Sequence, residues 1–287
     1  SEGNPRRDHK DRIEKIAAVQ IRPFPGDVQA NIQRHLELIE LALSLDSDLI
    51  IFPELSVTGY EPSLAANLAS SSPPGSSRDT RLDAFAEVSA EHQVVVCVGM
   101  PLWRCEEEED VEEQAEEKDE DGDGGGKTQK ILSPLPEIGM VIFRPDGARL
   151  SYSKQHLHED ELPYFRPAAT REPFLLSLSL SPSTSPAAAC APGICYETLL
   201  ASHAEAAHAA GASVYLASVA KPLRGIEKAV EHYPSIAARW LMPVILSNSV
   251  GACDDFVSVG GSGAWDARGR LLAQMDDRSE GVVVFDV

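Results

Sequence analysis

Short, nearly unbroken hydrophobic runs alternate with longer amphipathic segments in the first part of the chain. Residues 16–21, 48–52 and 94–98 are almost entirely apolar, which is typical of strands that are buried on both faces. Residues 28–45 carry apolar side chains at helical spacing, and Asp27 is a good N-cap for that helix. Buried strands separated by helices predict an α/β fold with helices outside a sheet.

The same alternation returns in the second half. Strands are expected at 213–218 and 243–247, and helices at 198–210 and 226–240. A β-hairpin is expected over 130–143 and 148–153, and a further strand over 174–180. The closing strands are expected over 257–265, 271–275 and 281–287. Because a β-α-β order repeats twice and each half ends in extra strands, the pattern predicts two packed sheets with helices outside.

One segment breaks this pattern by its charge. Residues 105–126 hold thirteen acidic residues and one lysine, and so carry 12 of the 20 net negative charges of the chain. Such a composition cannot bury a core, and we expect a disordered surface insert. We interpret residues 16–287 as a single domain that contains this insert, and residues 1–15 as a flexible N-terminal arm. A Ser/Pro-rich turn at 181–186 is a second insertion.

Composition excludes several classes of function. The acidity is not offset by a basic patch, so nucleic acid is not an expected partner. No run of about 18 apolar residues occurs, so no membrane span is expected. The five cysteines have irregular spacing and no C-x-x-C pair, which argues against a disulfide framework or a zinc site and favours a reducing, cytoplasmic setting.

Cys195 is the first candidate for chemistry. A buried cysteine is more often inert packing than a nucleophile. Here, however, Gly193 would allow a sharp turn, and Pro192 makes a continuous strand unfavourable. The segment after Cys195 is expected to open a helix, whose amides would lower the pKa of the thiol and could bind an oxyanion. The pattern therefore indicates a shaped turn that presents a thiol.

Two more polar side chains follow predicted strands. Glu54 comes directly after the run 48–52, where burial should raise its pKa and suit a general base, although it could simply cap the turn. Lys154 follows the strand 148–153, a place where a lysine is usually a solvated edge residue. The nearby pair His156 and His158 is a weak metal pattern without a third ligand, and no metal site is predicted.

These stretches together resemble the nitrilase superfamily of carbon–nitrogen hydrolases, which has a Glu, a Lys and a Cys in this chain order at the ends of core strands. The matching motifs are Phe52-Pro53-Glu54 with Thr58-Gly59-Tyr60, Tyr152-Ser153-Lys154-Gln155-His156-Leu157 with Glu161 and Phe165-Arg166-Pro167, and Ile194-Cys195-Tyr196-Glu197. Only the Ala191-Pro192-Gly193 segment departs from the family pattern. The resemblance covers roughly residues 16–287, apart from the two insertions.

The resemblance implies a four-layer α-β-β-α sandwich that dimerises through helices and uses no metal or organic cofactor. It also implies site roles. Cys195 would attack a carbonyl carbon, and Glu54 would transfer the protons. Lys154 and the backbone N–H of Tyr196 would stabilise the oxyanion, and Glu161 would orient Lys154 or the substrate and keep Lys154 protonated.

The implied reaction is hydrolysis of a non-peptide carbon–nitrogen bond. A small amide, aliphatic or with an ω-acid group, is expected as the substrate, and nitriles or N-carbamoyl compounds are the alternatives. Tyr60 is expected to contact the substrate. Pocket walls are expected from the loops 61–69, 159–166 and 219–233, where Lys221, Arg224, Glu227 and His232 could set the charge.

Two other hypotheses about the function stay open. A Cys–His hydrolase would pair Cys195 with His156, His203 or His208, although the last two are expected to be exposed on a helix. A catalytically degenerate binding or scaffold protein would use the acidic insert as its docking element. The presence of Glu54, Lys154 and Cys195 together argues against the scaffold.

Overall fold

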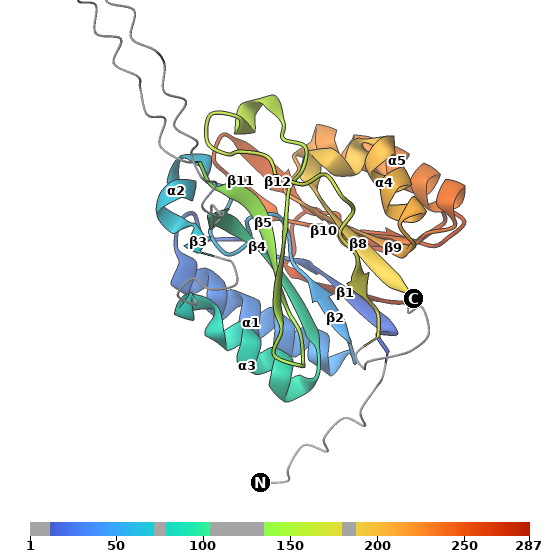
Figure 1. Cartoon of the computed structure of the whole chain (residues 1–287), viewed down its shortest axis with the longest axis horizontal. Helices are drawn as coiled ribbons and strands as arrows, with labels where there is room; N and C mark the ends of the chain where they lie inside the picture. The colour runs from blue at the N-terminus through green and yellow to red at the C-terminus, as the bar shows by residue number, and fades with distance from the viewer. Residues whose placement is uncertain (1–11, 72–78, 104–134, 180–187) are drawn as a thin grey trace, which may run out of the picture.

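Two β-sheets pack face to face between two layers of helices in the computed structural model, which describes residues 12–71, 79–103, 135–179 and 188–287 (Figure 1). The acidic insert, the Ser/Pro-rich turn and most of the predicted N-terminal arm lie outside these residues. Of the arm's described part, Ile13 is fully buried, and its N–H donates to the carbonyl of Leu178.

The first sheet has the strand order β15-β1-β2-β4-β5-β6, and β3 also pairs with β4. Strands β1, β2 and β4 run parallel, while β15, β5 and β6 are antiparallel to their neighbours. The bounds are β1 Lys15–Gln20, β2 Leu49–Ile51, β3 Ser70–Ser71, β4 Val95–Trp103, β5 Glu137–Phe143, β6 Arg149–Ser153 and β15 Gly281–Asp286.

The second sheet has the order β14-β13-β10-β9-β8-β7, with β8, β9 and β10 parallel. A separate two-stranded sheet pairs β11 with β12. The bounds are β7 Leu176–Ser177, β8 Ala189–Ile194, β9 Ala212–Val219, β10 Val244–Asn248, β11 Val250–Cys253, β12 Phe256–Val259, β13 Gly263–Trp265 and β14 Leu271–Gln274.

Alternation along each buried strand divides the apolar side chains among three layers. In β1, Ile16 and Ala18 face the second sheet, whereas Ala17 and Val19 face the helices. The helices α1 (Val28–Ser44) and α3 (Asp83–His92) cover the first sheet, and α4 (Ala201–Ala209) and α5 (Leu223–Trp240) cover the second. A fifth, short helix is α2 (Ala65–Leu68). The predicted four-layer α-β-β-α sandwich is confirmed.

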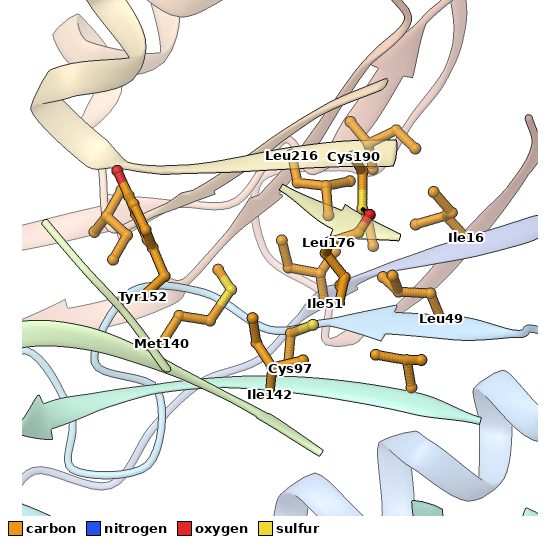
Figure 2. Close-up of a cluster of buried hydrophobic side chains, with 14 of the residues drawn as sticks. Ile16, Leu49, Ile51, Cys97, Met140, Ile142, Tyr152, Leu176, Cys190 and Leu216 are labelled. Carbon is orange, nitrogen blue, oxygen red and sulfur yellow. Dashed lines mark hydrogen bonds between the residues drawn. The ribbon is translucent and has the colours of Figure 1, made fainter. Parts of the chain in front are cut away.

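The layer between the sheets is closely packed. Figure 2 shows Cys190 and Leu216 of the second sheet reaching toward Ile51 and Cys97 of the first. Burial raises the pKa of the thiols of both Cys97 and Cys190. These two cysteines therefore serve as packing, and each described cysteine is a free thiol.

Some predicted elements have different bounds. The strand expected over 257–265 is two strands, because Gly260 and Gly261 have φ of +59° and +76° and turn the chain between β12 and β13. Among the described residues, the strand expected over 174–180 is limited to β7. The helix expected over 198–210 begins as a 3₁₀ turn, Cys195–Leu199, and becomes α-helical only from Ala201.

His35, on α1, gives the fold a predictable pH dependence. Its Nδ1 donates to the carbonyl of Asn31 (2.6 Å), its Nε2 accepts from the Ser56 hydroxyl (2.9 Å), and the ring stacks on Phe52. Burial lowers the pKa of His35 to about 4. The unfolded chain therefore takes up this proton near the ordinary pKa of histidine, whereas the folded chain does not, so stability falls as the pH drops from 6.5 toward 4.

We expect this one group to cost about 2 kcal/mol of unfolding free energy between pH 7 and pH 5. Urea unfolding of the wild type and of His35→Gln at the two pH values measures it. The variant should be less stable at pH 7 but should lose about 2 kcal/mol less on acidification. Equal losses in the two proteins would contradict the prediction.

Candidate active site

Glu54 is held at the end of β2 by a tight crossing over β4. Val57 N–H donates to the carbonyl of Gly99, and Leu55 has a φ of +52°. A Cβ on Gly99 would lie 2.4 Å from the carbonyl oxygen of Pro53 and 2.5 Å from the nitrogen of Leu55. Only glycine fits this crossing, which fixes Glu54 in a position where it is 1% exposed.

Lys154 follows β6 and is fully buried, so the solvated edge position usual for a lysine is excluded. Its backbone N–H continues the pairing with β5 by donating to Ile138. Its ammonium donates to Oε1 of Glu54 (2.8 Å) and to Oε1 of Glu161 (2.6 Å). Burial lowers the pKa of Lys154, but the two carboxylates outweigh that effect and raise it, so the side chain stays charged.

Glu161 lies in a short 3₁₀ turn, Glu159–Glu161, and connects the ammonium to the rest of the site. Its Oε1 also accepts from the hydroxyl of Tyr60 (3.1 Å), and its Oε2 accepts from the backbone N–H of His158 (2.8 Å). The ring of Tyr60 packs edge-on against Phe256 of the β11–β12 hairpin, 5.3 Å between ring centres. Tyr60, the residue predicted to contact the substrate, thus lies within the site.

Cys195 follows β8 and adopts a φ of +50°, a left-handed conformation that is rare for a side-chain-bearing residue. The preceding Ile194 is extended. The sharp turn therefore occurs at the cysteine itself, and the expectation that Gly193 makes the turn is wrong. Gly193 is instead required by packing, because a Cβ there would lie 2.6 Å from the hydroxyl oxygen of Tyr215.

The expectation that Pro192 interrupts the strand is also wrong. Pro192 pairs with Leu216 of β9 inside a continuous β8. The neighbour on the other side, β7, pairs only with Ala189 and Cys190. Beyond that point no described strand pairs with this side of β8, and a missing backbone N–H is tolerated at such an edge.

The thiol is held in its protonated form. Burial raises the pKa of Cys195 to about 11, with a further contribution from Glu54, although Lys221 and Lys154 oppose it. The expected lowering of the pKa by helix amides is therefore overridden by burial and by the nearby carboxylate. The Sγ of Cys195 lies 3.8 Å from the carbonyl oxygen of Ala220. A nucleophile in this state needs a base.

Glu54 is suited to be that base. Burial raises the pKa of Glu54, while Lys154 and the thiol of Cys195 lower it. Its Oε1 is occupied by Lys154, whereas its Oε2 is buried and has no partner at ordinary hydrogen-bond distance in the described part of the chain. A carboxylate oxygen in this condition can take a proton from the neighbouring thiol.

The residue after the nucleophile, Tyr196, directs its side chain away from the core. The side chain is 36% exposed and lies edge-on to the ring of His158. Its backbone N–H stands in the first turn after Cys195, where amides have no acceptor within the helix. The predicted role of this N–H at an oxyanion stays a prediction.

Glu197 belongs to the motif around Cys195, but the sequence alone predicts no role for it. Its Oε1 accepts from the backbone N–H of Ile194 (2.8 Å) and from the hydroxyl of Tyr152. Its Oε2 accepts from the backbone N–H groups of Gln155 (2.7 Å) and His156 (3.2 Å). One buried carboxylate therefore ties the turn that carries Cys195 to the strand end that carries Lys154.

The histidines do not form a second catalytic pair with the thiol. His203 was expected to be exposed, but its side chain is mostly buried and hydrogen-bonds to the hydroxyls of Tyr152 (3.0 Å) and Tyr215 (2.7 Å). In the described ranges, no histidine nitrogen is hydrogen-bonded to Cys195. The site geometry thus favours the Glu–Lys–Cys arrangement over a Cys–His hydrolase.

The sequence profile of the carbon–nitrogen hydrolases, described as "Carbon-nitrogen hydrolase", matches residues 15–287. The chain belongs to the carbon–nitrogen hydrolase family. The resemblance inferred from the three motifs is thereby confirmed, and the enzyme class with it.

Solved structures of this family share the fold. A cysteine-to-alanine variant of the amidase from Nesterenkonia sp. AN1 in complex with butyramide superposes with a TM-score of 0.73 at 20% identity, over 96% of this chain and 92% of that one. A glutamate-to-leucine variant of the same amidase, which shows covalent addition of the acetamide moiety of fluoroacetamide at the active-site cysteine, gives 0.72 at 20% identity, over 97% and 92%.

Curated relatives match only over short stretches. The glutamine-dependent NAD(+) synthetase of Acinetobacter baylyi is 50% identical over 46 residues, and that of Thermotoga maritima is 35% identical over 48 residues. The matched part is 16% and 17% of this chain and 8% of each synthetase. These proteins therefore share one local segment with this carbon–nitrogen hydrolase.

Glu197→Gln is expected to lower kcat by about 100-fold, because an amide cannot accept all four of the hydrogen bonds that the carboxylate accepts. Steady-state kinetics on the best amide substrate measures it. The pH profile of thiol alkylation should shift at the same time, since Cys195 moves relative to Glu54. Glu205→Gln, on the exposed face of α4, is the matched control. An unchanged kcat would contradict the role of this carboxylate.

Proposed function

We propose that this enzyme hydrolyses a small non-peptide amide to a carboxylic acid and ammonia or an amine, through a thioester on Cys195. The observation that carries the proposal is the convergence of three groups. A strained turn presents the thiol beside a buried carboxylate, Glu54, which is itself bound to a buried ammonium, Lys154. The amidase with the same fold, solved with butyramide, supports an amide as the substrate.

In the first step, Cys195 attacks the carbonyl carbon while Glu54 takes the thiol proton. Base assistance is needed because the thiol has a pKa of about 11. Negative charge then develops on the carbonyl oxygen. The Lys154 ammonium and the backbone N–H of Tyr196 stabilise it, and Glu161 orients the ammonium.

In the second step, Glu54 returns the proton to the nitrogen of the leaving group, the carbon–nitrogen bond breaks, and ammonia or an amine departs. The acyl group remains on Cys195 as a thioester. Glu54 then removes a proton from a water molecule that attacks the thioester, and the proton restores the thiol. The sum is one amide plus one water giving one acid plus one amine.

An ammonia-release screen over amides, N-carbamoyl compounds and nitriles tests the proposal, with Cys195→Ala as the control. We expect release from amides that disappears in the variant. If ammonia is released only from nitriles or only from N-carbamoyl compounds, Cys195 would still be the nucleophile, but the proposed substrate class would be wrong. If no class gives Cys195-dependent release, the proposed hydrolysis is wrong.

Assembly is proposed from the family resemblance, and location from the cysteine content. A homodimer formed through helices, or a higher homo-oligomer, and a cytoplasmic location stay predictions, and light scattering of the purified protein tests the first. Among the helices of the described residues, none has the length and hydrophobicity needed to span a bilayer.

A further inference from the structure

Lys221 follows β9 and is a second buried lysine at the site. It is 4% exposed, and its aliphatic carbons lie against Gly225 in the first turn of α5. Its backbone is fixed on both sides: the N–H donates to Oδ1 of Asn248 (2.9 Å), and the carbonyl accepts from the Ser258 hydroxyl (3.1 Å). These backbone hydrogen bonds and the packing against Gly225 fix the position of Lys221 inside the protein.

The ammonium of Lys221 has no ion pair and no hydrogen bond with any described residue. Lys154 is equally buried, but it is bound by two carboxylates, Glu54 and Glu161. A buried charge is costly unless a group of opposite charge accompanies it. Both acidic neighbours of the thiol are already engaged by Lys154, so none of the residues that the structure describes provides a counter-charge for Lys221.

Lys221 lies at the same edge of the second sheet as Cys195, because β8 and β9 run parallel and Ile194 pairs with Ser218. The carbonyl of the adjacent Ala220 is 3.8 Å from Sγ of Cys195. The charge of Lys221 opposes the burial that raises the pKa of the Cys195 thiol, and it adds to the burial that lowers the pKa of the His232 imidazole. Lys221 therefore stands beside the strand end that carries the thiol and against the first turn of α5, where it can face a substrate bound at the thiol.

His232, on α5, provides a second observation. Its Nε2 is buried and has no hydrogen-bond partner within the described ranges. Buried polar nitrogens of this kind are uncommon in folded proteins and indicate a missing partner. This nitrogen lies on α5, the helix against which Lys221 packs and whose Tyr233 hydroxyl is hydrogen-bonded to Thr198 in the turn that begins at Cys195.

We propose that Lys221 and His232 form a subsite for an anionic group on the acyl part of the substrate, so that the preferred amides carry a carboxylate. This inference rests on the proposed amide hydrolysis and specifies its substrate class. The carboxylate would accept from the Lys221 ammonium and from His232 in its Nε2–H form. With its anionic end fixed there, the amide carbonyl would be presented to Cys195.

Two amides of equal length test the subsite. Butyramide ends in a methyl group, and succinamate ends in a carboxylate at the same position. We expect the wild type to have a kcat/KM for succinamate at least about 10-fold above that for butyramide. Lys221→Met should lower kcat/KM for succinamate on the order of 100-fold, mainly through KM, and should lower kcat/KM for butyramide by a much smaller factor. Lys228→Met, on the exposed face of α5, is the control.

Several results would overturn the subsite. Equal losses on both amides would show that Lys221 acts on the thiol and does not bind the substrate. A wild type without preference for succinamate would refute the subsite while leaving amide hydrolysis intact. His232→Gln gives a second, independent variant and should weaken succinamate selectively if Lys221→Met does not fold.

Binding measured without turnover separates this inference from the proposed function. Calorimetry with Cys195→Ala should show tighter binding of succinamate than of butyramide, and addition of Lys221→Met should remove the difference. If the wild type hydrolyses no carbon–nitrogen compound but this difference is seen, the subsite stands and the proposed hydrolysis fails. Equal binding of both compounds would refute the subsite whatever the turnover.

Discussion

Lys154→Met should lower kcat for amide hydrolysis by at least about 1,000-fold. The substitution removes the ammonium that we propose stabilises the developing oxyanion. It also leaves Glu54 and Glu161 buried side by side without the cation that both contact at 2.8 Å and 2.6 Å. Burial already raises the pKa of Glu54, and loss of the cation raises it further. A larger fraction of the base would then be protonated and unable to accept the thiol proton.

Ammonia release at saturating amide measures this effect, and Lys228→Met controls for loss of a lysine charge. Circular dichroism and the urea midpoint establish that the variant is folded before its activity is compared. A variant that keeps a tenth of the wild-type kcat would contradict the assigned role. Such a result would also reopen the Cys–His alternative, which needs no lysine.

Glu54→Gln should move two measurements in opposite directions. Amide turnover should fall by about 1,000-fold or more, because the glutamine cannot take the proton of the thiol. The thiol itself should become more acidic, because the negative charge of Glu54 contributes to raising the pKa of Cys195 to about 11. Removing that charge lowers the pKa, so more thiolate is present at pH 8 and alkylation by iodoacetamide becomes faster.

The rate of Cys195 alkylation as a function of pH, followed by mass spectrometry, gives the apparent pKa in both proteins. Glu205→Gln, on the exposed face of α4, is the control for a general loss of negative charge. If the apparent pKa of the thiol rises in Glu54→Gln, or if turnover is unaffected, then Glu54 does not act on Cys195 as proposed.

The central strands of the fold could be predicted from the sequence, because strands that are buried on both faces appear as short, nearly unbroken apolar runs. The ends of the strands and the edges of the sheets could not be predicted in this way. The break between β12 and β13 depends on the positive φ of Gly260 and Gly261, and the short β7 depends on how little of β8 it covers. Such bounds are set by neighbours distant in the sequence.

The candidate site, too, could be predicted from the sequence only in part. Glu54, Lys154 and Cys195 could be located because each follows a predicted strand and matches a motif. The pKa of the thiol could not, since its direction depends on burial and on Glu54, not on the local helix amides. Pro192 was expected to break the strand because the sequence does not show that, among the described residues, no strand pairs with β8 on that side. Glu197 was visible, but its four donors come from two segments that are far apart in the sequence, residues 152–156 and Ile194.

Glu54 and Lys154 extend from strands of one sheet, and Cys195 extends from a strand of the other (Figure 1). A hydroxyl of the second sheet, Ser218, donates to the carbonyl of Phe52 next to the Glu54 turn (2.9 Å). Neither half of the chain therefore possesses a reactive centre of its own. Hydrolysis therefore requires the two sheets to be packed against each other, so turnover reports on that packing, and a folding intermediate with undocked sheets would be inactive.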